Sequence, residues 1–184
     1  MARIPYADAA TQSESVRHYI DLSGGLNILR MLSHAGPATF EGFNQLSRGL
    51  MIESKLDVQL REIAILRVGH LSRAAYEIYH HEAIGRGVGL TEQQLTAIRE
   101  GDAQAAVLTP PQRAVLAFAD DVELNVRAGD ATLEAVRAVL SDSDLVELIM
   151  VIGCYMMVAR LLETTGVDMD QLPLSVRTLA AKSS

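Results

Sequence analysis

The stretch LREIAILRVGHLSRAAYEIYHHEAIGRGVG, residues 60–89, decides the fold of this chain. In its first half, Leu60 and Val68 lie on one apolar helical face, and Asp57 stands where a residue that caps the helix start is expected. A second helix is predicted to begin near Ala74. Because only a tight turn fits between the two, they are expected to form a helical hairpin.

Helix-start residues also precede most of the other apolar segments. Thr91 with Gln94, and Thr109 with Gln112, have the spacing of capping boxes, in which two side chains satisfy free backbone amides. No run combines strict alternation, β-branched residues and turn dipeptides, as a strand would. We therefore predict an all-α protein, a compact bundle of eight or nine helices. Further starts are predicted at Pro37, which leads a helix over 38–51, and at Asp130 and Ser141, with a stop at Gly166.

Length and composition indicate one domain. A chain of 184 residues can bury one substantial core but is short for two. We expect the core at about residues 25–168, because the residues before Ser23 and after Leu172 are too polar or too few to form cores and are interpreted as arms. Residues 60–66 and 145–151 both read Leu-x-Glu followed by four apolar residues. An internal duplication would produce this similarity, although Leu-rich helices also produce it by chance.

The charge balance argues against two classes of partner. Lysine and arginine total 16 against 23 acidic residues, a formal net charge of −7, so the chain repels phosphate backbones and anionic membrane surfaces. The sequence shows neither a basic patch nor an apolar signal segment at the N-terminus. We therefore expect no nucleic-acid partner, no membrane partner and a cytoplasmic location.

The single cysteine, Cys154, lies in an uncharged run of 12 residues, 148–159. It cannot form an intrachain disulfide, which agrees with a reducing compartment, and burial would keep its thiol neutral. The run is shorter than the roughly 20 residues needed to cross a bilayer. Because this helix is apolar on every side, we expect it at the centre of the domain or at an interface between subunits.

Glu77 and His81 are the first candidates for chemistry. They are four residues apart, so their side chains meet on one helical face, where a carboxylate can orient an imidazole for proton transfer. Glu62, on the preceding helix, could point into the same pocket, and burial among apolar neighbours would require a polar partner for it. The alternative is that Glu77 and His81 form an ordinary surface pair.

A metal site is a weaker interpretation of the same segment. Glu77-x-x-His80 has the spacing of half a di-iron site in a helical bundle, but the chain has no second Glu-x-x-His. We therefore predict no metal. The adjacent His80 and His81 point about 100° apart on a helix, so both are not expected to serve one pocket easily.

Residues 60–90 resemble the core motif of the carboxymuconolactone decarboxylase domain, in which a Leu-Arg-Glu helix precedes a Tyr-Glu-x-x-x-His helix and then Gly-Leu. The likeness continues at residues 27–34, 116–120 and 155–160, in the same order as in longer members of the superfamily. It covers about residues 25–168 and implies the all-helical fold of alkylhydroperoxidase D.

In alkylhydroperoxidase D relatives, a Cys-x-x-Cys-x-x-x-His motif begins 12 residues after a glutamate. By this spacing the resemblance retains Glu62 and His81, and it places Ala74 and Glu77 where the two thiols would be. A peroxide-reducing cycle needs an attacking and a resolving thiolate. The resemblance therefore implies a member without peroxidase chemistry.

Without the two thiols, the motif is similar to that of the cysteine-free decarboxylases. In a γ-carboxymuconolactone the departing carboxylate is vinylogous to the lactone carbonyl, so loss of carbon dioxide leaves a delocalised dienolate. The resemblance implies a lyase without a cofactor, acting on a small carboxylated lactone or related intermediate of aromatic catabolism. It assigns proton transfer to His81 with Glu77, and orientation to Glu62 with Tyr76. Contacts with the substrate are expected from Arg67, Arg160 and His80, although each arginine could equally form a structural ion pair.

Two other functions stay open. One is a non-catalytic helical oligomer that binds a small apolar ligand or a partner protein. The other is a peroxidase, which the missing thiols make the least attractive. The resemblance also implies a homo-oligomer, a trimer or a hexamer, and the apolar helix around residues 148–159 favours the same expectation.

Overall fold

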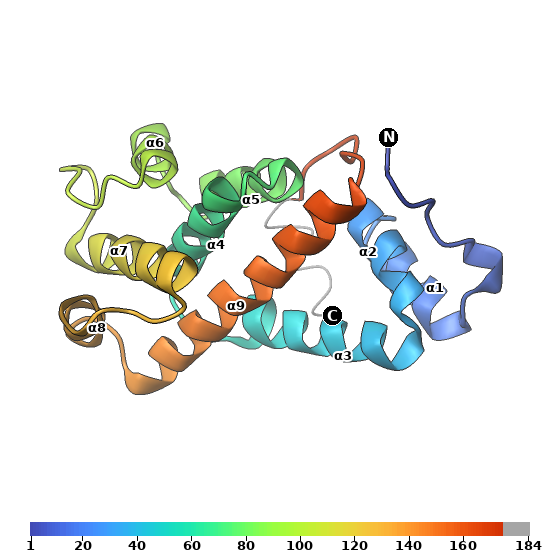
Figure 1. The fold of residues 1–184 in the computed structure, drawn as a ribbon, viewed down its shortest axis with the longest axis horizontal. Helices are drawn as coiled ribbons and strands as arrows, with labels where there is room; N and C mark the ends of the chain where they lie inside the picture. Colours follow the sequence, from blue (N-terminus) through green and yellow to red (C-terminus); the bar gives the residue numbers. More distant parts are fainter. Residues whose placement is uncertain (175–184) are drawn as a thin grey trace.

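The computed structural model describes residues 1–174, and in this part of the chain it contains nine α-helices and no strand (Figure 1). The predicted all-α fold is confirmed. Short helical turns precede α1 and link α2 to α3. The α-helices are α1 (Glu14–Leu22), α2 (Asn27–Leu32), α3 (Pro37–Arg48), α4 (Val58–Ser72), α5 (Ala75–Gly87), α6 (Glu92–Glu100), α7 (Pro110–Asn125), α8 (Asp130–Arg137) and α9 (Asp142–Thr165).

The local capping signals fix most of the helix starts. The Asp57 side chain accepts hydrogen bonds from the first backbone amides of α4, and the Ser141 side chain caps α9. Both predicted capping boxes are formed, at the starts of α6 and α7. Gly166, at φ 64°, ends α9 in the left-handed region that favours glycine. Helix α8 begins at Asp130, as predicted, and its N-cap is Gly129.

Helix α4 lies at the centre of the molecule. All ten residues from Leu60 to Gly69 are buried, and the helix packs against α9, α7 and α5. Three of these buried residues are charged, namely Arg61, Glu62 and Arg67. Because burying an unpaired charge is expensive, each of them needs a partner inside the protein.

The end of α3 differs from the predicted continuous helix over residues 38–51. The α-helix stops at Arg48, and a π-helical turn, η3 (Gly49–Glu53), continues it with the wider i to i+5 spacing. Leu50 and Met51 of this turn are buried against α4 and α9, in a cluster with Ile65 and Val151. The turn therefore forms part of the core.

The N-terminal residues are more structured than predicted. The segment before Ser23 was expected to be an arm, but it contains α1, whose Val16 is buried in a cluster with Leu29 and Phe40. The ring of Tyr19 also packs edge-on against Phe40. The arm interpretation was wrong because a single apolar face, although too short for its own core, suffices to dock a helix. Of the predicted C-terminal arm, only residues up to 174 lie in the described part.

Helix α9 has one buried and one exposed apolar face. Its inner face packs against α4 and α7, which makes it a core helix although its length and apolar composition would also suit a membrane-crossing helix. On its outer face, Met150 is 46% and Met157 is 49% exposed, whereas Cys154 is buried. Within one chain the helix is therefore not fully enclosed. Val146 and Ile149 extend the same exposed apolar face.

Candidate active site

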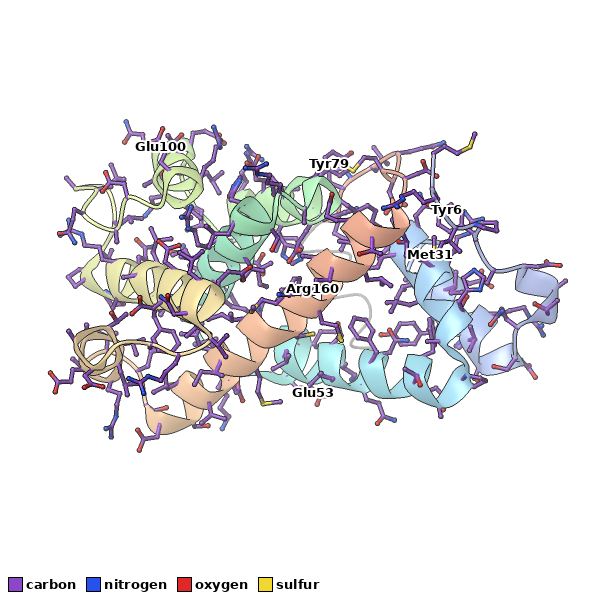
Figure 2. All side chains as sticks on the ribbon, in the orientation of Figure 1. Tyr6, Met31, Glu53, Tyr79, Glu100 and Arg160 are labelled. Carbon is purple, nitrogen blue, oxygen red and sulfur yellow. The ribbon has the colours of Figure 1, made fainter. Side chains whose placement is uncertain are left out.

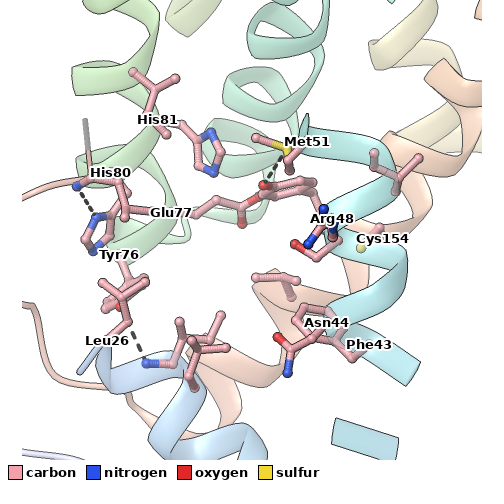
Figure 3. Close-up of a pocket in the computed structure, with 18 of the residues that line it drawn as sticks. Leu26, Phe43, Asn44, Arg48, Met51, Tyr76, Glu77, His80, His81 and Cys154 are labelled. Atoms are coloured by element: carbon pink, nitrogen blue, oxygen red, sulfur yellow. Dashed lines mark hydrogen bonds between the residues drawn. The ribbon is translucent and has the colours of Figure 1, made fainter. Parts of the chain in front are cut away.

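A pocket of about 130 Å³ opens between α2, α3, η3, α5 and α9 (Figure 3). Helix α5 contributes its polar side chains, while α3 and α9 form most of the opposite walls. A cavity of about this size in another protein holds a single benzene ring. The pocket therefore matches a ligand with one small ring.

The deepest polar pair behind this pocket joins Glu62 to His81. Glu62 is completely buried on α4, and its Oε2 lies 2.7 Å from Nδ1 of His81 on α5. The other carboxylate oxygen lies 3.6 Å from Nε of the buried Arg61. Because Nδ1 donates to the carboxylate, Nε2 is the ring nitrogen left to exchange a proton with a ligand. Glu62 thus has the polar partner that its burial requires.

Glu77 stands alone in the same pocket. It is 2% exposed, and neither of its carboxyl oxygens has a hydrogen-bond partner among the described residues. Burial, with smaller contributions from Glu123 and Glu163, raises the pKa of Glu77 well above its usual range. The expected pairing of Glu77 with His81 is therefore not formed. Their spacing allows it, but Glu62 takes the histidine nitrogen instead.

Aromatic and thiol groups of α9 complete this end of the pocket. The Tyr155 ring packs edge-on against His81, with 4.9 Å between ring centroids, and its hydroxyl donates to the Met51 sulfur. Cys154 also lines the pocket, where burial and the neighbouring Glu77 raise the pKa of its thiol to about 11. Such a thiol is a poor nucleophile near neutral pH.

His80 and Tyr76 line another wall of the pocket (Figure 3). The Tyr76 hydroxyl donates to Asp170, and the same carboxylate lies 3.1 Å from His80 Nε2. The backbone N–H of Leu174 donates to His80 Nδ1. Burial lowers the pKa of His80 to about 4. Tyr76 therefore does not orient His81, as was expected, but holds the segment after α9 against α5.

Both adjacent histidines line this one pocket, which corrects the expectation that they could not easily share it. His80 and His81 do point in different directions from α5, but the pocket extends along the helix far enough to meet both (Figure 3). Only His81 presents a ring nitrogen without a backbone or carboxylate partner. Within residues 1–174, no group of three or more His, Cys, Asp or Glu side chains could hold a metal ion.

The two arginines expected to bind a substrate lie elsewhere. Arg67 forms an ion pair with Asp120, and its Nη1 donates to the Ile98 and Arg99 carbonyls, which is the structural role considered as its alternative. Arg160, on α9 (Figure 2), is exposed and donates to the carbonyl of Met156 in its own helix. Neither lines the pocket. The predicted contacts of Arg67 and Arg160 with a ligand in this pocket are therefore not formed.

Arg48, which the sequence did not single out, does line the pocket. It is the last residue of α3, and its Nε pairs with Glu53 at 2.8 Å. Asn44, one turn earlier, is buried, and its Nδ2 donates to the Phe40 carbonyl. No local pattern marks these residues, because their approach to α5 depends on how α3 packs.

The part of the chain that contains α4 and α5 matches a known protein family. Residues 37–121 match the model of the carboxymuconolactone decarboxylase family, a range that contains Glu62, Glu77 and His81. This part of the chain is similar to that family, and the chain shares its fold with structures described as alkylhydroperoxidase D-like. No match was found among curated proteins.

Several solved structures share the fold of this chain at low sequence identity. An uncharacterised peroxidase-related protein from Ralstonia eutropha JMP134, described as an alkylhydroperoxidase AhpD core, is 22% identical with a TM-score of 0.78, over 92% of this chain and 93% of its own. A peroxidase-related protein from Silicibacter sp. TM1040 is 21% identical with a TM-score of 0.78, over 92% of each chain. The debrominase Bmp8, as a cysteine-to-alanine variant with 2,3,4-tribromopyrrole, is 17% identical with a TM-score of 0.70, over 95% and 91%.

Proposed function

We propose that this protein is a cofactor-independent lyase of the decarboxylase type, acting on a small carboxylated lactone or a related catabolic intermediate. The observation that carries the proposal is Glu77. A buried carboxyl group without a hydrogen-bond partner, whose pKa is raised, favours the neutral acid and faces a pocket beside a histidine. Such a group is suited to donating a proton to a carbanion.

The reaction uses one proton. The bond between the ring carbon and the carboxylate breaks, its electron pair passes into the dienolate, and carbon dioxide leaves. Glu77 donates its proton to a carbon of the dienolate and becomes a carboxylate. His81 then returns a proton from water to Glu77, and Glu62 holds its imidazole in place through the 2.7 Å hydrogen bond. The apolar walls favour loss of the charged carboxylate, because they replace its water shell.

Two further observations support this choice. The pocket volume of about 130 Å³ suits one small ring, and a solved structure of the same fold carries a single-ring ligand, tribromopyrrole. Peroxidase chemistry fits less well, because Ala74 and Glu77 stand at the positions of the two thiols and the pKa of Cys154 is raised to about 11.

The test is turnover of γ-carboxymuconolactone and related carboxylated lactones, followed by lactone absorbance and by released carbon dioxide. Glu77→Gln keeps the shape of the side chain but removes its proton, so we expect the rate to fall roughly 100-fold or more. Glu134→Gln, at an exposed position on α8, is the matched control and should leave the rate unchanged. Ligand binding without turnover across the panel would assign the non-catalytic alternative.

We also propose that the protein is a cytoplasmic homo-oligomer, a trimer or a hexamer. The exposed apolar face of α9 supports assembly, because a monomer's outer helix should present polar side chains to water. The single cysteine supports a reducing compartment.

A further inference from the structure

We infer that Arg48 recognises a carboxylate of the ligand, so that the pocket selects anions built on a single small ring. This inference rests on the proposed function, since it names the residue that selects the carboxylated substrate class. It concerns binding, and it can therefore be tested without turnover.

Arg48 is placed to contact a ligand at the open side of the pocket. Its side chain is 51% exposed and lies across the pocket from Tyr76 and His80 (Figure 3). Its Nε donates to Glu53, which fixes the guanidinium plane and leaves the two Nη groups available as donors. A guanidinium offers two parallel N–H groups, which match the two oxygens of a carboxylate.

The charged residues that line the pocket indicate that Arg48 is the group that binds an anionic ligand. Among the described residues that line it, Arg48 is the sole lysine or arginine, and Glu77 carries the sole carboxyl group. Glu77 favours its neutral form, and burial keeps His80 uncharged near neutral pH. Arg48 is therefore the group of the pocket lining that can pair with a ligand anion, through the two Nη groups that its ion pair with Glu53 leaves free.

The other arginines near the central helix cannot take this role. Arg61 is buried beside Glu62 and donates to the Leu50 carbonyl, and Arg67 is bound to Asp120. Neither lines the pocket. A ligand carboxylate placed at Arg48 would leave its ring among the apolar side chains of α2, η3 and α9, within a volume that limits it to one ring.

The test compares benzoate with its neutral amide, benzamide, as binding probes for the full-length protein, by calorimetry or by ligand-observed NMR. Wild type should bind benzoate more tightly than benzamide. Arg48→Gln should weaken benzoate binding about 10-fold, which equals about 1.4 kcal/mol, and change benzamide binding by less than about 2-fold. Arg48→Lys keeps the charge but not the two parallel N–H groups, so it should recover only part of the benzoate affinity that Arg48→Gln loses. Arg86→Gln removes an exposed, ion-paired arginine outside the pocket and is the matched control, with no change expected.

Salt provides a second readout. Because Arg48 is half exposed, raising the salt from about 50 mM to about 500 mM should weaken benzoate binding to wild type but not to Arg48→Gln. Equal benzoate affinity in wild type and Arg48→Gln, or no preference of wild type for benzoate over benzamide, would overturn the inference. If benzoate binds through Arg48 but no lactone is decarboxylated, the proposed function fails and the inference stands. If a lactone is decarboxylated but benzoate binds equally well to wild type and to Arg48→Gln, the inference fails and the proposed function stands.

Discussion

His81 Nδ1 lies 2.7 Å from Oε2 of Glu62, 19 positions away in the sequence, whereas Glu77, only four positions away on the same helix, shares no hydrogen bond with it. This arrangement divides the two acids between two tasks. One acid is paired and holds the imidazole in place, and the other is unpaired and favours its protonated form. Two carboxyl groups with different surroundings can then take different roles in one reaction.

Removing His81 should destabilise the protein. His81→Ala leaves the completely buried Glu62 without its hydrogen-bond partner. We expect a loss of about 3 kcal/mol in the free energy of unfolding, measured by urea denaturation. The double variant Glu62→Gln/His81→Ala should recover part of this loss. Additive losses in the double variant would show that the pair is not coupled.

Stability should depend on pH through Glu77. Because its pKa is raised in the folded state, mainly by burial and further by Glu123 on α7 and Glu163 on α9, the folded protein favours the protonated acid. This contribution is complete below the unfolded value and is lost as pH rises through the folded value. Glu77→Gln lacks the titration, so its stability relative to wild type should increase between about pH 5 and about pH 8.5. A constant difference in urea midpoints across this range would refute the raised pKa.

Thiol peroxidase activity should be absent. With the pKa of Cys154 raised to about 11, only roughly one thiol in 10⁴ is ionised at about pH 7, and no second cysteine can resolve an oxidised one. Turnover of an organic hydroperoxide with a dithiol reductant should therefore equal the uncatalysed rate, in wild type and in Cys154→Ser alike. Fast turnover that Cys154→Ser abolishes would contradict the prediction.

The exposed face of α9 should mediate assembly. Light scattering coupled to size exclusion is expected to give a mass of three or six subunits at low micromolar concentration. Met150→Lys, which places a charge in this apolar face, should shift the mass toward one subunit, whereas Glu134→Lys on α8 should not. A single-subunit mass for wild type across a dilution series would refute the proposal.

The helix boundaries were predictable because their signals are local. Asp57, Thr91, Thr109 and Ser141 satisfy backbone amides within three residues of themselves, so the sequence alone identifies them as caps. The π-helical turn after Arg48 has no such signal, since it depends on how Leu50 and Met51 pack between α4 and α9.

The members of the candidate site were easier to predict than their contacts. Spacing placed Glu77 and His81 on one face, and the family resemblance added Glu62, but neither decides which acid reaches the histidine. Arg48 was not identified from the sequence as a pocket residue, and Arg67 was wrongly placed there. Both errors have one cause. A charged residue on a helix carries no local mark of whether it faces a ligand or, as Arg67 does, an internal partner such as Asp120.

The π-helical turn η3 makes the pocket sensitive to chain length as well as to residue type. Its i to i+5 spacing accommodates one more residue than an α-helical turn would, and it follows directly after Arg48. Deleting one residue from Gly49–Glu53 would leave the number of residues that an α-helical turn holds, so Leu50 and Met51 could not both keep their places in the pocket wall. Insertions and deletions between Pro37 and Asp57 should therefore change ligand preference among relatives even where every pocket residue type is kept.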